Sequence, residues 1–98
     1  MMAIAVVMDF TGGTVEQYDE ACRRLGFEPK GPGAPGGLFH WAASTEGGLR
    51  ITDVWQDKET WEAFTADKLT PVSTEIGIPA PEVAFYEVYN YQTQGPAL

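Results

Sequence analysis

The sequence predicts a single α+β domain with the element order strand, helix, strand, strand, helix, strand. Three observations lead to this prediction. Strand-like runs of apolar and β-branched residues lie near both ends, a helix-capping box lies in T-V-E-Q, and a short Glu/Gly turn joins two central strand-like runs. At 98 residues the chain is one small domain, with an ordered core expected over residues 3–92, a loop over 27–37 and a tail over 93–98.

The first strand, expected over residues 3–10, has two different faces. One face carries small or polar residues, and the other carries the larger side chains Ile4, Val6, Met8 and Phe10. Because successive side chains of a strand alternate between the two faces, we expect the larger ones to meet the helices.

The first helix should begin at the capping box of Thr14 and Gln17 and stop at Gly26. Residues 27–37, FEPKGPGAPGG, contain three Pro and four Gly and show no periodicity. This segment is either a surface connection or the rim of a pocket.

The second half of the chain begins with strand-like runs over 38–45 and 49–56, which form a hairpin. Asp57 should cap a second helix whose apolar stripe is Trp61, Phe64 and Leu69. We expect a break at Pro71, a short further turn of helix, and a final strand over 82–92.

This element order predicts the ferredoxin-like βαββαβ arrangement, in which both helices pack on one face of a four-stranded antiparallel sheet. The other face would then be bare, although the final strand region is rich in aromatic residues, among them Tyr86, Tyr89 and Tyr91. We therefore expect a homodimer in which two sheets face each other as a dimeric α/β barrel.

The hairpin brings together the candidate site residues His40, Asp53 and Trp55, which share one face if the loop has two residues. With Glu46-Gly47 as the loop, His40 lies opposite Asp53; with Gly47-Gly48 it lies opposite Trp55. A three-residue loop would send His40 to the helix side.

We expect the face of His40, with Ile51 and with Asp9 of the first strand, to be the open one. The opposite face should pack against the helices and carries Phe39, Trp41, Ala43, Thr52 and Val54. His40 beside Asp53 in an aromatic cavity could act as a general base with an orienting carboxylate, or could form a structural hydrogen bond.

Composition excludes several classes of function. A net charge of −8 disfavours nucleic acid and anionic membranes as partners, and the longest apolar run is too short to span a bilayer. The single cysteine, Cys22, excludes an intramolecular disulfide, and one histidine with scattered acids makes a poor metal site. We expect a cytoplasmic protein that uses no metal or other cofactor.

The segment D-V-W-Q-D-K-E-T-W-E-A-F, residues 53–64, resembles the dimeric α/β-barrel proteins of the antibiotic-biosynthesis-monooxygenase type. This family includes cofactor-independent monooxygenases that oxidise aromatic polyketides to quinones, haem-degrading enzymes, and isomerases or cyclases. The resemblance implies that Trp55 lines a pocket. The chain departs from the family in having Asp9 where the oxygenases have an Asn, and Thr65-Ala66 where the haem degraders have a His.

We therefore expect a small pocket enzyme acting on an apolar, aromatic or polyketide-like metabolite by proton abstraction, followed by oxygenation, isomerisation or cyclisation. His40 would be the base and Asp53 its orienting group, while Trp55, Asp9, Ile51, Tyr86 and Tyr89 would contact the substrate. The alternative is a non-catalytic homodimer that binds a small molecule or has a structural role.

Overall fold

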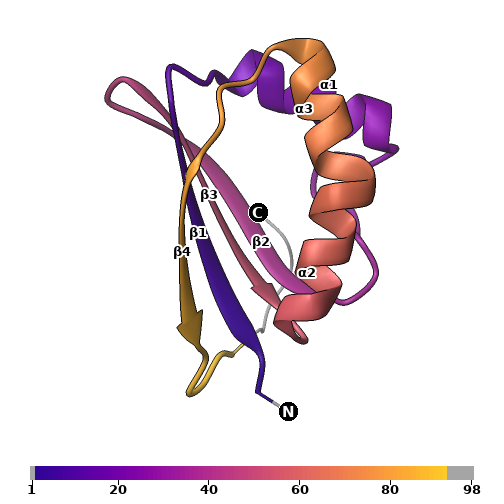
Figure 1. The fold of residues 1–98 in the computed structure, drawn as a ribbon, viewed down its shortest axis with the longest axis vertical. Helices are drawn as coiled ribbons and strands as arrows, with labels where there is room; N and C mark the ends of the chain where they lie inside the picture. Colours follow the sequence, from indigo (N-terminus) through magenta and orange to yellow (C-terminus); the bar gives the residue numbers. More distant parts are fainter. Residues whose placement is uncertain (1, 93–98) are drawn as a thin grey trace.

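The computed structural model describes residues 2–92, so the predicted tail over 93–98 lies outside the described residues. The elements in chain order are β1 (Ile4–Thr11), α1 (Val15–Leu25), β2 (Gly37–Thr45), β3 (Gly48–Trp55), α2 (Lys58–Phe64), the π-helical segment η1 (Thr65–Leu69), α3 (Thr70–Ile76) and β4 (Glu82–Glu87). The strands form one antiparallel sheet in the order β2-β3-β1-β4, and the helices lie on one side of it (Figure 1). This confirms the ferredoxin-like fold.

The predicted helix starts are confirmed by their hydrogen bonds. At the start of α1, Thr14 Oγ1 accepts from the Gln17 backbone N–H at 3.1 Å, and Gln17 Oε1 accepts from the Thr14 N–H at 3.1 Å. Gly26 ends α1 in the left-handed region at φ 81°. Asp57 Oδ1 accepts from the Thr60 N–H at 2.7 Å and caps α2. Local side chains thus satisfy some of the free N–H groups at both starts.

The predicted break at Pro71 is wrong, because α2, η1 and α3 form one continuous helical rod (Figure 1). Pro71 lies in the first turn of α3, directly after the π-helical segment, where the Thr70 N–H bonds to the Thr65 carbonyl. A proline lacks an N–H and crowds the preceding turn of an α-helix. The wider π-turn before Pro71 accommodates the ring without ending the rod.

The predicted end of the last strand is also wrong. β4 stops at Glu87, so Tyr89 and Tyr91 follow the strand instead of belonging to it. The alternation of Tyr and Val in this part of the sequence favours a longer strand, but β1 has no residues before Ile4 with which residues after Glu87 could pair. Its pairing with β4 starts at Ile4 opposite Glu87, and one more bond joins the Val88 N–H to the Ala3 carbonyl.

The core lies between the sheet and the helices, as the alternation of β1 predicts. Val6, Met8 and Phe10 are buried there, and the register places them opposite Asp53, Ile51 and Leu49 of β3. Trp55 and Trp61 complete the core. Directly paired residues of antiparallel strands share a face, so the buried face of β1 is also the face of Asp53 and Trp55.

The hairpin has the two-residue loop Glu46-Gly47, and His40 lies directly opposite Asp53. However, the predicted identity of the two faces is wrong: His40, Asp53 and Trp55 face the helices. Asp53 misled the prediction because a carboxylate suggested an open face, whereas Leu49, Ile51 and Trp55 on alternate positions bury that face.

The residues predicted to meet the helices lie instead on the opposite, uncovered face of the sheet. We call it the open face; its side chains are Ala5, Val7, Asp9, Thr11, Phe39, Trp41, Ala43, Thr45, Arg50, Thr52, Val54, Glu82, Ala84 and Tyr86. Phe39 is 50% exposed, Trp41 40% and Tyr86 61%, so Trp41 is not a core residue in the single chain.

Candidate functional site

The candidate site is a chain of four hydrogen-bonded side chains on the helix-facing side of the sheet. The Asp53 carboxylate of β3 contacts His40 Nδ1 of β2 at 2.5 Å through Oδ1. Its Oδ2 accepts a hydrogen bond from Trp55 Nε1 at 3.0 Å. The cross-strand register places His40 beside Asp53, and the two-residue strand period places Trp55 on the same face.

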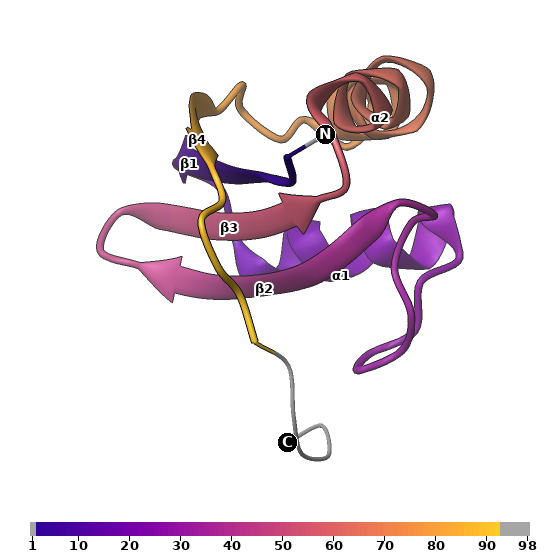
Figure 2. The same cartoon turned by 90° about the horizontal axis from the view of Figure 1, so that it is seen from below.

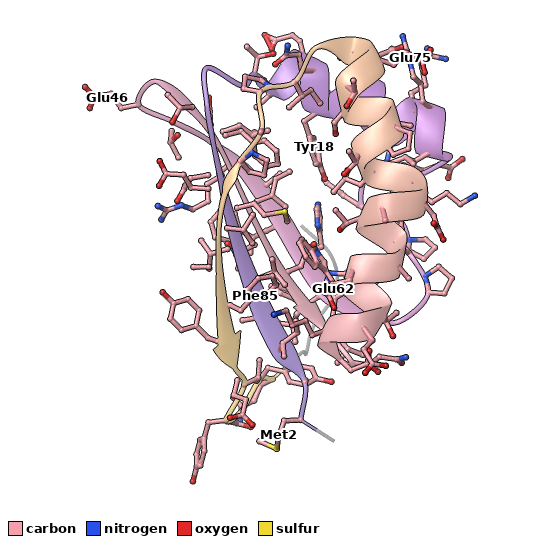
Figure 3. All side chains as sticks on the ribbon, in the orientation of Figure 1. Met2, Tyr18, Glu46, Glu62, Glu75 and Phe85 are labelled. Atoms are coloured by element: carbon pink, nitrogen blue, oxygen red, sulfur yellow. The ribbon has the colours of Figure 1, made fainter. Side chains whose placement is uncertain are left out.

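The fourth member is Tyr18, whose hydroxyl lies 2.5 Å from His40 Nε2. The plane of its ring lies 13° from the imidazole plane and the ring centroids are 5.8 Å apart, so the two rings lie end to end with nearly parallel planes. Figure 3 shows Tyr18 reaching from α1 into the space between the sheet and the helices. Sequence reasoning missed this role because Tyr18 falls on the apolar stripe of α1. A phenol on such a stripe is itself a signal, since a buried hydroxyl needs a hydrogen-bond partner.

The chemistry of the donors fixes the direction of these bonds. A carboxylate only accepts, so His40 Nδ1 carries the proton that Asp53 receives. In the neutral imidazole Nε2 is then the acceptor, and it accepts from the Tyr18 O–H. Burial raises the pKa of Tyr18, with further contributions from Cys22 and Asp53, which keeps its hydroxyl protonated. The basic lone pair of His40 thus points toward α1.

The hydrogen-bonded side chains of the site differ in how much of their surface is exposed. Asp53 is 7% exposed and Trp55 3%, and the Trp55 ring packs on Phe64 with centroids 5.4 Å apart. By contrast, 45% of the His40 side chain is exposed, because β2 is the edge strand of the sheet. A small molecule can therefore approach His40 from solvent, while the Asp53 carboxylate that orients the imidazole is shielded from water.

Three of the predicted substrate contacts do not join this site. Asp9 lies on the open face, where Arg50 Nε donates to its Oδ1 at 2.7 Å. This hydrogen bond is the main cause that lowers the pKa of Asp9. Tyr86 also lies on the open face, and Tyr89 is 99% exposed after β4. Their predicted position beside His40 is wrong, because it depended on placing His40 on the open face. Ile51 does share the helix-facing side, buried opposite Met8.

Among the described residues, two cavities flank the rod formed by α2, η1 and α3, one on each side of it. The Trp61 cavity, of about 270 Å³, lies between the rod and strands β1 and β4, and the segment 78–81 closes one side. The Phe64 cavity, of about 400 Å³, lies between the rod, the end of α1 and the Gly/Pro loop. Phe27, Ala34 and Pro35 of that loop line the Phe64 cavity, as expected for a pocket rim. Neither cavity is lined by His40 or Asp53.

Figure 2 shows the arrangement from below, with α2 above the β1 side of the sheet and α1 toward β2. Among residues 2–92, no three His, Cys, Asp or Glu side chains are grouped so that they could hold a metal ion. In the same part of the chain, no helix is long and apolar enough to cross a membrane.

The sequence matches no protein-family profile and no curated protein. The fold does match solved structures. A single-site variant of SnoaB, a cofactor-independent oxygenase from Streptomyces nogalater, is 12% identical with a TM-score of 0.65, and the match covers 96% of this chain and 100% of that chain. A Chloroflexus aurantiacus protein, provisionally classed as an antibiotic biosynthesis monooxygenase, is 18% identical with a TM-score of 0.64 over 95% and 99% of the two chains.

At these identities the similarity establishes a shared fold. The chain has the ferredoxin-like fold of the antibiotic-biosynthesis-monooxygenase-type proteins, as the resemblance of residues 53–64 predicts.

Proposed function

We propose that the protein is a small enzyme that removes a proton from an aromatic or polyketide-like metabolite, with His40 as the base. The contact of His40 Nδ1 with Asp53 Oδ1 carries this proposal. It holds the imidazole in the tautomer in which Nε2 bears the lone pair that takes the proton, and it stabilises the imidazolium that forms. Trp55 Nε1 in turn fixes the carboxylate.

Tyr18 has a place in the same step. Its hydroxyl donates to His40 Nε2, so a substrate must either displace it or pass a proton through it. In the second case Tyr18 gives its proton to His40 as it receives one from the substrate. Because burial raises the pKa of Tyr18, a free tyrosinate is disfavoured, and the two transfers are concerted.

The reaction favoured after proton removal is oxygenation. SnoaB, which shares the fold at 12% identity, is a cofactor-independent oxygenase. In the proposed reaction an activated ring methylene and O₂ give a ring carbonyl and water. The methylene loses two hydrogens and four electrons, one oxygen atom becomes the carbonyl, and the other leaves as water. Isomerisation or cyclisation would begin with the same proton abstraction but would consume no O₂.

The same arrangement fits a structural role, because both ring nitrogens of His40 already have partners and so tie α1 to the sheet.

We further propose that the open face is the homodimer interface. Phe39, Trp41 and Tyr86 together expose aromatic surface that a monomer would leave in water, and the second sheet would cover it.

Turnover of aromatic compounds with an activated methylene separates the catalytic from the structural role. Oxygen uptake and incorporation of label from ¹⁸O₂ into the product would be followed for the wild type, His40→Gln and Asp53→Asn. Glu46→Gln at the exposed hairpin tip is the matched control, since it makes a carboxylate-to-amide change remote from the site. We expect loss of turnover in the first two variants alone. Reduced stability with unchanged turnover would overturn the catalytic role.

A further inference from the structure

The outer edge of β2 has no backbone partner among the described residues. β2 is an outermost strand of the sheet and pairs only with β3 (Figure 2). Alternate residues of such a strand direct their N–H and C=O groups away from the sheet. Within residues 2–92, no backbone hydrogen bond reaches that side of residues 38–45. Every residue of β2 except Ala42 is exposed, so this edge can accept a further strand.

The other outermost strand, β4, is protected against such pairing, whereas β2 is not. β4 has six residues and begins and ends with Glu82 and Glu87, and Lys58 Nζ lies 4.4 Å from the centre of its Phe85 ring. β2 has nine residues, and no Asp, Glu, Lys, Arg or Pro occurs among them. Natural proteins place charged residues and proline on sheet edges to prevent further strands from adding there. β2 lacks both devices.

The order of residues in β2 fits a second copy of the same strand. Its pairing with β3 is regular from Phe39 to Thr45, and Ala42 is the midpoint of that segment. The larger side chains come first and the smaller ones last in its sequence, F-H-W-A-A-S-T. Antiparallel pairing of two copies about Ala42 therefore places each large side chain opposite a small one. The pairs are Trp41 with Ala43 of the partner copy, His40 with Ser44 and Phe39 with Thr45.

Charge favours the same occupant. The chain has a net charge of −8, so two copies repel each other overall. β2 carries no acidic or basic residue apart from its histidine, so this pairing puts no like charges opposite each other. Across the axis, the two copies of Trp41 are diagonal neighbours, which lie within reach of each other when the side chains are aromatic. Trp41 is 40% exposed in the single chain, and the pairing would cover part of it.

We propose that β2 pairs with β2 of a second copy, antiparallel and about a two-fold axis at Ala42, so that two four-stranded sheets join into one. This contact uses the backbone at the edge of the sheet, whereas the interface proposed for the open face uses side chains. It does not rest on the function proposed for His40. Trp41→Glu would weaken both contacts, because it places two like charges near the axis. The test therefore uses the helix-facing side of β2.

Disulfide formation at Ala42 tests the pairing. In a Cys22→Ser background, Ala42→Cys would place two thiols directly opposite each other, with Cα atoms about 4.5–5.5 Å apart, which a disulfide can span. Ser44→Cys is the matched control on the same side of the strand, and its two copies would lie about 14 Å apart. We expect mild oxidation to give covalent dimers of Ala42→Cys and none of Ser44→Cys. Because both side chains face the helices, contact between two open faces does not bring either pair together.

Amide hydrogen exchange of the unsubstituted protein gives a second test. We expect the β2 amides that point away from β3 to exchange more slowly than the outward-pointing amides of β4, by about tenfold or more. Fast exchange of these β2 amides, no disulfide at Ala42, or equal cross-linking of the two Cys variants would overturn the proposal. Slow exchange without the disulfide at Ala42 would overturn it as well, because another segment would then cover the edge.

Discussion

Replacing Asp53 by Asn should invert the tautomer of His40. The carboxylate accepts from His40 Nδ1 and from Trp55 Nε1, whereas an amide has one accepting oxygen and one donating NH₂. Trp55 Nε1 can only donate, so the amide oxygen must face it and the NH₂ must face His40. Nδ1 then becomes the acceptor, and Nε2 carries the proton and donates to the Tyr18 oxygen.

Substitutions of Asp53 should change the stability of the protein and its turnover by different amounts. Asp53→Asn keeps a partner for every polar group, so we expect it to lower the free energy of unfolding by about 1 kcal/mol. Asp53→Ala leaves the buried Trp55 N–H unpaired and opens a small cavity, so we expect it to lower the free energy of unfolding by about 3 kcal/mol. Turnover should nevertheless fall by about 10³–10⁴ in the Asn variant, because the lone pair of Nε2 is lost.

Nitrogen chemical shifts of the single histidine report the tautomer directly, and urea denaturation at fixed protein concentration gives the stability. We expect a protonated Nδ1 in the wild type and a protonated Nε2 in Asp53→Asn. The same His40 tautomer in the wild type and in Asp53→Asn would refute this reasoning. So would a greater loss of stability in Asp53→Asn than in Asp53→Ala.

Three further predictions concern α1, the open face and the Gly/Pro loop. Tyr18→Phe should cost about 1 kcal/mol at neutral pH. Burial raises the Tyr18 pKa above 10.0, so the wild type should lose stability as the pH rises above about 10, and urea titrations of the Phe variant should lack that part of the slope. Trp41→Glu places a charge on the aromatic open face and should yield monomers in analytical ultracentrifugation; an unchanged mass would exclude this face as the interface. Gly36→Ala should lower the free energy of unfolding by roughly 1–3 kcal/mol, because Gly36 has φ 89° and a Cβ there would lie 2.6 Å from Thr60 Cγ2. Gly33→Ala, with open space around it, is the control and should unfold at the wild-type temperature or above.

Local sequence patterns determined most of the secondary structure. Thr14 and Gln17 fix the start of α1, and Asp57 fixes that of α2, through bonds to residues three positions away. The Glu46-Gly47 turn and the strand period fix the register that pairs His40 with Asp53. These features depend on neighbours in the chain or across one turn, so the sequence contains their causes. Pro71 and the end of β4 are the exceptions. The π-turn before Pro71 changes the geometry on which the local rule depends, and β1 has no partner for a longer β4.

The sequence by itself determined the element order and the alternation of β1, and for a two-residue loop it limited the position of His40 to one opposite Asp53 or one opposite Trp55; the structure shows the first. Only the tertiary structure decided which face of the hairpin is covered. Alternation separates two sets of side chains, but whether a set containing an Asp is buried depends on partners from other elements. Here Trp55 and His40 satisfy the carboxylate, Tyr18 closes the site from α1, and Val6 of β1 lies opposite. These contacts bring Asp53 inside the domain and leave Trp41 outside.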